Sequence, residues 1–258
     1  MTGSLIVSLE SRGSLSIVSM ARPERRNALS VAMREELIAV LTTAMDDRDT
    51  RVVVLTGSGG NFCAGGDLDD FDLADVEAGR VRMRRAHVLP RLIATSRKPV
   101  IAAVEGSAFG AGLSVALMCD HVIAAGNARL CASFVNAGLM PDYGSLWALY
   151  ARAPHALVNE MVMQARELSG TEAAAAGLIN AACPEGEALE RALAVAEDLA
   201  RRPPLVLQAI KEARAAATGL EDLFRQEIEW QARLFVSEDF AEAVSAFKER
   251  RKPEFKGR

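Results

Sequence analysis

Val104-Glu-Gly-Ser-Ala-Phe-Gly-Ala-Gly-Leu-Ser114 lies between a predicted strand, Val100–Val104, and a predicted short helix, Ala111–Met118. The first N–H groups of a helix have no acceptor within the helix, and the helix dipole gives them a partial positive charge. Such an end can bind a phosphate or stabilise an oxyanion. The stretch lacks the G-K-[ST] of a Walker loop and does not match G-x-G-x-x-G, so its glycines alone support nucleotide binding only weakly.

A second glycine loop, Asn61-Phe-Cys-Ala-Gly-Gly-Asp-Leu68, also follows a predicted strand, Val52–Thr56. Glycine lets the backbone come close to a ligand and adopt φ values that other residues avoid. The N–H group of Gly66 could then point into a pocket. An ordinary glycine turn is the alternative interpretation, and it is the commoner one for a bare Gly-Gly pair.

Strands and helices alternate around these two loops. The runs Leu5–Leu9 and Leu15–Met20 predict a hairpin. A helix is expected to begin near Ser30, and a long arginine-rich helical stretch is expected from about Val76 to Thr95. The continuous apolar run of Val52–Thr56 indicates a strand that is covered on both faces. This alternation is typical of an α/β fold.

The last third of the chain is predicted to be helical. Helical segments are expected at Glu185–Arg201, Leu205–Ala217, Leu220–Phe235 and Glu238–Arg250. We therefore divide the chain into a sheet-containing core, residues 1–200, and a C-terminal helical region, residues 201–258. The tail helices have more apolar surface than a solvated tail needs. They serve either an oligomer contact, which we favour, or packing on the core of the same chain.

Composition excludes several classes of function. Of 258 residues, 50% are hydrophobic and 25% charged, which is ordinary for a globular protein with a substantial core. The formal net charge of −4 provides no global basic field for nucleic acid. The four cysteines are far apart, without a C-x-x-C pair, so neither a structural zinc site nor a disulfide framework is expected.

No membrane helix or signal peptide is predicted. The longest mostly apolar stretch, Pro99–Met118, is interrupted by Glu105 and by three glycines, Gly106, Gly110 and Gly112. A membrane-spanning helix needs about 20 predominantly apolar residues. The amino terminus lacks a basic segment followed by a long apolar run. We therefore expect a cytoplasmic protein with free thiols.

Motifs along almost the whole chain resemble those of the enoyl-CoA hydratase/isomerase (crotonase) superfamily. They are Arg22-Pro-Glu-Arg-Arg-Asn-Ala-Leu-Ser30, the Asn61–Leu68 loop, Lys98-Pro-Val-Ile-Ala-Ala-Val-Glu-Gly106 with Gly110-Ala-Gly112, Ala137-Gly-Leu-Met-Pro-Asp142, Leu168-Ser-Gly-Thr-Glu-Ala-Ala-Ala-Ala-Gly-Leu-Ile-Asn180 and Phe247-Lys-Glu-Arg-Arg-Lys-Pro-Glu-Phe255. The resemblance implies a spiral of ββα turns and a C-terminal helical region that forms a homotrimer or a dimer of trimers. It also implies a role in fatty acid metabolism, with an acyl-CoA substrate, no metal and no separate cofactor, since coenzyme A is part of the substrate.

The resemblance also implies the residues of a site. In this family the thioester carbonyl oxygen lies between two backbone N–H groups, which map to Gly66 and Ala111, in agreement with the analysis of the two loops. Removing one such donor typically costs about 3–4 kcal/mol of transition-state stabilisation. Residues expected to bind coenzyme A or the acyl chain are Arg25, Arg26, Ala64, Leu68, Phe134 and, on a phosphate of the same or a neighbouring subunit, Arg250.

The carboxylates decide which reaction is expected. Well-known hydratases of this family use two glutamates at the positions of Ser114 and Phe134, neither of which can act as a base. Asp142 remains, at a turn where several isomerase-like branches carry a catalytic aspartate. Burial among apolar neighbours would raise the pKa of its carboxyl toward neutrality, which suits proton transfer. A turn residue after proline is the alternative role for Asp142.

We therefore expect an enzyme that shifts the double bond of an enoyl-CoA, with Asp142 carrying a proton from C2 to C4. An enoyl-CoA hydratase that uses Asp142 and an ordered water is the second hypothesis. A catalytically silent acyl-CoA-binding oligomer is the alternative from another class, since both glutamates are absent. An RNA-binding relative is disfavoured by the acidic net charge and by the lack of an aromatic and basic stripe.

Overall fold

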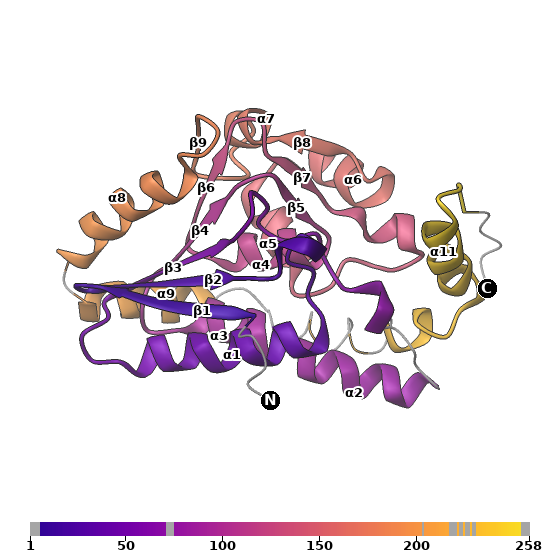
Figure 1. The fold of residues 1–258 in the computed structure, drawn as a ribbon, viewed down its shortest axis with the longest axis horizontal. Coiled ribbons are helices and arrows are strands. Elements are labelled where there is room, and N and C mark those ends of the chain that lie inside the picture. Colours follow the sequence, from indigo (N-terminus) through magenta and orange to yellow (C-terminus); the bar gives the residue numbers. More distant parts are fainter. Residues whose placement is uncertain are drawn as a thin grey trace.

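The computed structural model describes residues 6–70, 75–202, 204–216, 221, 224, 228 and 231–253. The larger sheet has the strand order β1-β2-β3-β4-β6-β9, and the smaller sheet has the order β5-β7-β8 (Figure 1). The strands are β1 (Val7–Arg12), β2 (Leu15–Met20), β3 (Val52–Gly57), β4 (Val100–Val104), β5 (Ser107–Phe109), β6 (His121–Ala125), β7 (Arg129–Cys131), β8 (Glu167–Ser169) and β9 (Ala181–Cys183).

Helices stand between the strands along the chain as far as β9, and among the described residues only helices follow β9. They are α1 (Val31–Asp46), α2 (Val76–Ala86), α3 (Val88–Thr95), α4 (Ala111–Met118), α5 (Ser145–Arg152), α6 (His155–Gln164), α7 (Gly170–Ala175), α8 (Ala188–Ala200), α9 (Pro204–Ala216) and α11 (Glu238–Glu249). Three short 3-10 helices are η1 (Pro23–Arg25), η2 (Leu68–Asp70) and η3 (Ser133–Ala137). Part of the predicted segment Leu220–Phe235 lies outside the described residues. So does Leu5, the first residue of the predicted hairpin.

The predicted hairpin and the first helix are confirmed. Strands β1 and β2 pair in antiparallel fashion, whereas β2, β3, β4, β6 and β9 pair in parallel. Ser30 caps α1, because its side chain accepts a hydrogen bond from the backbone N–H of Met33. Since β3 and β4 are parallel neighbours, the loops that follow them leave the same edge of the sheet.

The arginine-rich helical stretch expected from about Val76 to Thr95 is confirmed. It consists of two helices, α2 and α3, which meet at His87. Pro90 explains the break, because it has no N–H group to donate to the carbonyl of Ala86 and its ring would clash with that carbonyl. The short strands β5, β7, β8 and β9 were not expected, and each has three residues.

Strand β3 is buried on both faces, as the continuous apolar run predicted. Alternate residues of β3 belong to different clusters: Val53 and Leu55 to the main core, Val52 and Val54 to a second one. That second cluster is covered by three alanines of α8, which are Ala188, Ala192 and Ala196. The main core lies on the opposite face and includes side chains of α1, α3 and α4. Among the residues that are described, no helix has the length and apolarity needed to span a membrane.

The C-terminal region packs against the core of its own chain. Phe224, Phe235 and Phe240 are buried in the main cluster. Lys211 on α9 forms a buried ion pair with Asp120, in the turn between α4 and β6. Same-chain packing therefore accounts for part of the apolar tail surface. The division at residue 200 and the oligomer contact remain predictions.

Candidate active site

One cavity of about 740 Å³ lies between the two glycine loops and the C-terminal segment. Residues of η1, α2 and the Asp142 turn complete its wall. It is lined by eight of the nine residues proposed from the sequence, namely Arg25, Arg26, Ala64, Gly66, Leu68, Ala111, Phe134 and Asp142. Arg250, the ninth, is not among the described residues that line the cavity.

The first loop is held by the side chain of Asn27. This residue is fully buried, and its Nδ2 donates to the carbonyl oxygens of Ser58 at 2.9 Å and Asn61 at 2.7 Å. Farther along, Leu29 bonds to both neighbours of Gly66: its N–H donates to Gly65, and its carbonyl accepts from Asp67. The N–H of Gly66 is left out of this ladder.

The second loop packs directly on the first. Cys63 pairs with the Ser107–Phe109 strand, because its N–H donates to Ser107 at 2.9 Å and its carbonyl accepts from Phe109 at 3.0 Å. A Cβ atom added to Gly112 would lie 2.4 Å from the Cys63 carbonyl oxygen, and one added to Gly65 would lie 2.9 Å from the Phe109 carbonyl oxygen. Only glycine permits this approach at both positions, and so the two loops meet.

Two residues with unengaged main-chain donors line one cavity. Ala111 is the first residue of α4, where an N–H has no acceptor within the helix. Within the described part of the chain, neither the Ala111 N–H nor the Gly66 N–H has a hydrogen-bond acceptor. The α4 dipole adds partial positive charge at Ala111. The wall thus holds two polarised donors suited to negative charge on a ligand oxygen.

Asp142 stands in the same wall on a tight turn. It is 6% exposed, and the residues after it, Tyr143 and Gly144, have positive φ angles of 54° and 76°. Its carbonyl accepts from the N–H of Ser145 at 3.0 Å, and its Oδ2 accepts from Gln231 Nε2 at 2.8 Å. A buried carboxylate with a hydrogen-bond donor beside it is a candidate base.

The positions where related hydratases carry glutamates hold no acid or base. Ser114 is fully buried, and its hydroxyl donates to the Gly110 carbonyl oxygen at 3.1 Å within α4. Phe134 lines the cavity with an aromatic ring. Asp142 is therefore a buried carboxylate in a wall that also includes Met83 and Leu139. The buried Asp67 also lines the wall and is paired with Arg22 at 2.6 Å.

Three titratable side chains surround Asp142. Burial lowers the pKa of His87 to about 4, against the opposing charge of Asp142, and the imidazole stacks on Phe224 at a centroid distance of 4.3 Å. Burial also raises the pKa of Tyr143 to about 12. Burial lowers the pKa of Arg82, a lining residue whose guanidinium is influenced by Asp142. At neutral pH the histidine and the tyrosine are therefore uncharged, and Arg82 is a cation of the wall that interacts with Asp142 and Tyr143.

Another part of the cavity wall is rich in charge. Arg25 and Arg26 belong to the end of η1, and Arg25 forms an ion pair with Asp69 at 3.2 Å. Lys248 on α11 also lines the cavity and approaches Asp69 at 3.8 Å. Arg250 adopts the left-handed conformation that ends α11 and is exposed. Its proposed phosphate contact remains a prediction, and Lys248 is the cation that this helix places at the mouth.

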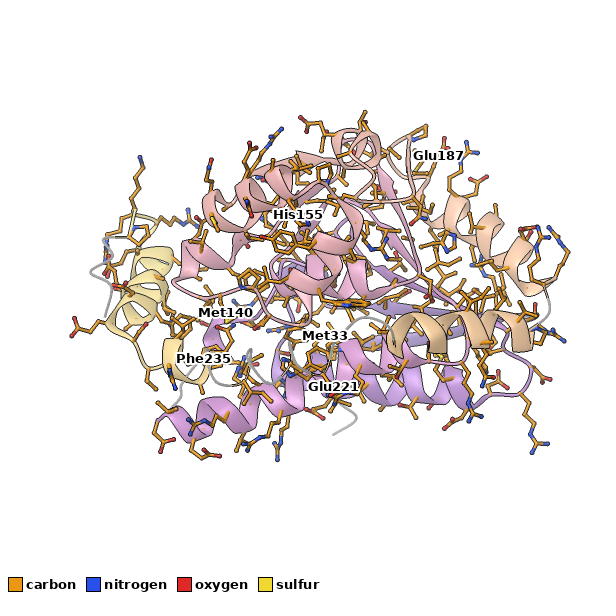
Figure 2. All side chains as sticks on the ribbon, turned by 180° about the vertical axis from the view of Figure 1, so that it is seen from behind. Met33, Met140, His155, Glu187, Glu221 and Phe235 are labelled. Atoms are coloured by element: carbon orange, nitrogen blue, oxygen red, sulfur yellow. The ribbon has the colours of Figure 1, made fainter. Side chains whose placement is uncertain are left out.

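Sequence reasoning missed the residues that the C-terminal segment and α2 contribute. Phe235, Phe247 and Lys248 line the cavity together with Arg82, and Figure 2 places Phe235 between α2 and α11. The Arg82 guanidinium lies 5.9 Å from the centre of the Phe235 ring. The motif that begins at Phe247 pointed to this region, but no pattern in the sequence marked Arg82 or Phe235. Among the described residues, no group of acidic, histidine or cysteine side chains could hold a metal ion.

Comparison with known proteins agrees with this geometry. Residues 10–258 match the family model described as enoyl-CoA hydratase/isomerase. The chain is 37% identical to 2,3-dehydroadipyl-CoA hydratase of Escherichia coli (strain K12), over 98% of this chain and 99% of that protein. It is 34% identical to 1,2-epoxyphenylacetyl-CoA isomerase of the same organism, over 93% and 94%. An enoyl-CoA hydratase structure from Mycobacterium avium subsp. paratuberculosis K-10 superposes with a TM-score of 0.88 at 30% identity, covering 97% of this chain and 98% of that one. The fold is thus the crotonase fold, and the chain belongs to the enoyl-CoA hydratase/isomerase family.

Proposed function

We propose that this enzyme shifts the double bond of an enoyl-CoA thioester. The observation that carries the proposal is the buried carboxylate of Asp142, in the same cavity wall as the two unengaged amides of Gly66 and Ala111. The other buried carboxylate among the described residues of this wall, Asp67, is paired with Arg22 at 2.6 Å. Arg25 and Arg26 would bind phosphates of coenzyme A at the charged part of the wall, where charge-assisted hydrogen bonds are strong. Ala64 and Leu68 would contact its nucleotide portion, and Phe134 the acyl chain.

The reaction needs one proton carrier. The Asp142 carboxylate takes a proton from C2 of a 3-enoyl-CoA, and the C–H electron pair moves into the thioester to form a dienolate. The negative charge develops on the thioester oxygen, where the N–H groups of Gly66 and Ala111 stabilise it. The dienolate then takes the same proton at C4, which forms the C2–C3 double bond and restores the carboxylate. No water, metal or separate cofactor enters these steps.

Hydration is the second candidate, and the name of the 37% identical relative favours it. Addition of water requires that a group activate the water and that a proton reach C2. Here Asp142 would perform both tasks through an ordered water, since Ser114 and Phe134 cannot. A silent acyl-CoA-binding protein is the third candidate, because the glutamates of related hydratases are missing.

The test compares the wild type with Asp142→Asn on two substrates. We expect the wild type to convert a 3-enoyl-CoA into the conjugated 2-enoyl-CoA, which is followed by thioester absorbance, and to leave 2-enoyl-CoA unhydrated. Asp142→Asn keeps the shape but lacks the base, so kcat should fall by at least about a thousandfold while acyl-CoA binding persists.

Other outcomes of this test would support a different function or a different base. Formation of a 3-hydroxyacyl-CoA from 2-enoyl-CoA would identify a hydratase. Tight acyl-CoA binding without isomerisation, and without exchange of the C2 proton in deuterated water, would leave a binding protein. A variant Asp142→Asn with the wild-type rate would show that another group is the base.

A further inference from the structure

Asp142 is hydrogen-bonded to a glutamine from far along the chain. Gln231 and Asp142 are 89 positions apart, and the distance from Nε2 to Oδ2 is 2.8 Å. Gln231 is 0% exposed and is not among the described residues that line the cavity. It therefore contacts the carboxyl group from the protein side, whereas the cavity meets Asp142 from the substrate side.

The other groups near Asp142 come from several elements. Arg82 comes from α2, His87 from the junction of α2 and α3, and Tyr143 from the turn itself; the buried Arg34 of α1 interacts with Tyr143. His87 and Tyr143 are uncharged at neutral pH, and the two arginines are cationic. Gln231 differs from all of them because it has no titration of its own. It can orient the carboxyl group without adding charge to the site.

The carbonyl oxygen of the Gln231 amide bears on how the amide is oriented. Its Oε1 is buried and has no hydrogen-bond donor among the described residues. A buried carbonyl oxygen without a donor is costly. Rotation of the amide by half a turn would place Oε1 beside Oδ2 of Asp142, so that two acceptors would face each other. The amide therefore holds its Nε2 on Oδ2.

We propose that Gln231 is the positioning residue for the proton carrier, with its Nε2 holding Oδ2 of Asp142 so that the other carboxyl oxygen is the one that receives the proton. In the resting enzyme Nε2 donates to the carboxylate. After the C2 proton has moved to the other oxygen, Oδ2 is a carbonyl oxygen that still accepts from Nε2, and the proton remains on the substrate side for delivery to C4. Gln231 neither gains nor loses a proton. The inference rests on the proposed function, since it requires Asp142 to carry the proton.

The test replaces Gln231 by methionine, which has a similar size but neither donor nor acceptor. We expect kcat for isomerisation to fall about ten- to a hundredfold, the range for losing one hydrogen bond to a charged group. KM should change by less than about twofold, because Gln231 does not line the cavity. The acidic limb of the kcat/KM profile should move to higher pH, because the donor that favours the ionised carboxylate is lost.

Phe240→Leu is the matched control. Phe240 is buried in the same C-terminal region but does not line the cavity. Its truncation should lower Tm without moving the acidic limb. The inference is overturned if Gln231→Met behaves as Phe240→Leu should, with a lower Tm and an unmoved acidic limb of the kcat/KM profile. Gln231 would then have only a structural role. A wild-type kcat in Gln231→Met also overturns it.

A titration of Asp142 by carbon-13 carboxyl NMR separates this inference from the proposed function. We expect a higher Asp142 pKa in Gln231→Met than in the wild type. An unchanged titration overturns the role of Gln231 even where Asp142→Asn abolishes isomerisation. A wild-type protein that neither isomerises 3-enoyl-CoA nor exchanges the C2 proton overturns the proposed function, whether or not the titration moves.

Discussion

Tyr143 shows how the backbone of single residues shapes the site. Its φ of 54° lies in the left-handed region, which is unfavourable for a residue with a bulky side chain. Non-glycine residues in this conformation occur mostly where the surrounding structure enforces them, and they cluster at functional sites. Here the conformation sets Asp142 in the cavity wall while the tyrosine ring is buried near Arg34.

At the same scale, His87 is expected to make the fold sensitive to acid. Burial lowers its pKa from the ordinary value of 6.5 to about 4 in the folded protein. Below 6.5 the unfolded chain therefore binds a proton that the folded chain rejects, so stability should fall as the pH drops through this window. The loss should reach about 2 kcal/mol near pH 5.

Urea unfolding of the wild type and of His87→Phe, near pH 7.5 and near pH 5, measures this effect. The phenylalanine can still stack on Phe224 but does not titrate, so the variant should lose less stability in acid. His155→Gln is the control, because His155 is exposed. An equal loss in His87→Phe and the wild type would contradict the assignment to His87.

At the scale of elements, the N-terminus of α4 allows a main-chain donor to be removed by substitution. Ala111 is the first residue of the helix, the position where proline is best tolerated. Ala111→Pro would remove the N–H while the helix persists. We expect kcat to fall about 10²- to 10³-fold, as for loss of an oxyanion donor.

Ala111→Gly retains the N–H group and serves as the control. Steady-state isomerisation kinetics and circular dichroism of both variants check the prediction. Ala111→Pro with native circular dichroism and the wild-type kcat would show that this amide does not stabilise the developing charge.

The elements that were predicted correctly are those with long local signals. Strands β3 and β4 are continuous apolar runs, and α4 starts directly after a glycine loop. The three-residue strands β5, β7, β8 and β9 are too short for any alternation, and they exist because the spiral brings neighbours to them. The break between α2 and α3 could have been read from Pro90.

The residues of the site also divide into those with a local sequence signal and those without one. Gly66, Ala111 and Asp142 lie in local motifs, and the structure brings all three to one cavity. Gln231 and Arg82 had no such signal, because only tertiary packing places them beside Asp142. Arg250 was proposed from a short motif. It caps the end of α11, and the cation of this helix that lines the cavity is Lys248.

At the scale of the whole molecule, we expect a homotrimer or a dimer of trimers. Large apolar side chains remain exposed on the single chain, among them Val206 and Ile210 on α9, 53% and 59% exposed, and Phe247 at 69%. Val206 and Ile210 are four residues apart and so share a helix face. Such a face is commonly covered by another subunit.

Sedimentation velocity measures the assembly. The wild type should sediment as three or six copies of the chain, and Ile210→Glu should shift the distribution toward smaller species. Because Ile210 is mostly exposed on the single chain, the variant should keep its fold. A wild type that sediments as a monomer at all concentrations would contradict the prediction.

Two of the segments that line the cavity contribute different groups. The glycine loops contribute the main-chain donors proposed to hold the charge, and segment 231–248 contributes Phe235, Phe247 and Lys248. Mutation in that segment can therefore alter which acyl groups are accepted while the charge-holding loops stay intact. Descendants of one ancestral gene could thus diversify in substrate choice and inherit the same chemistry.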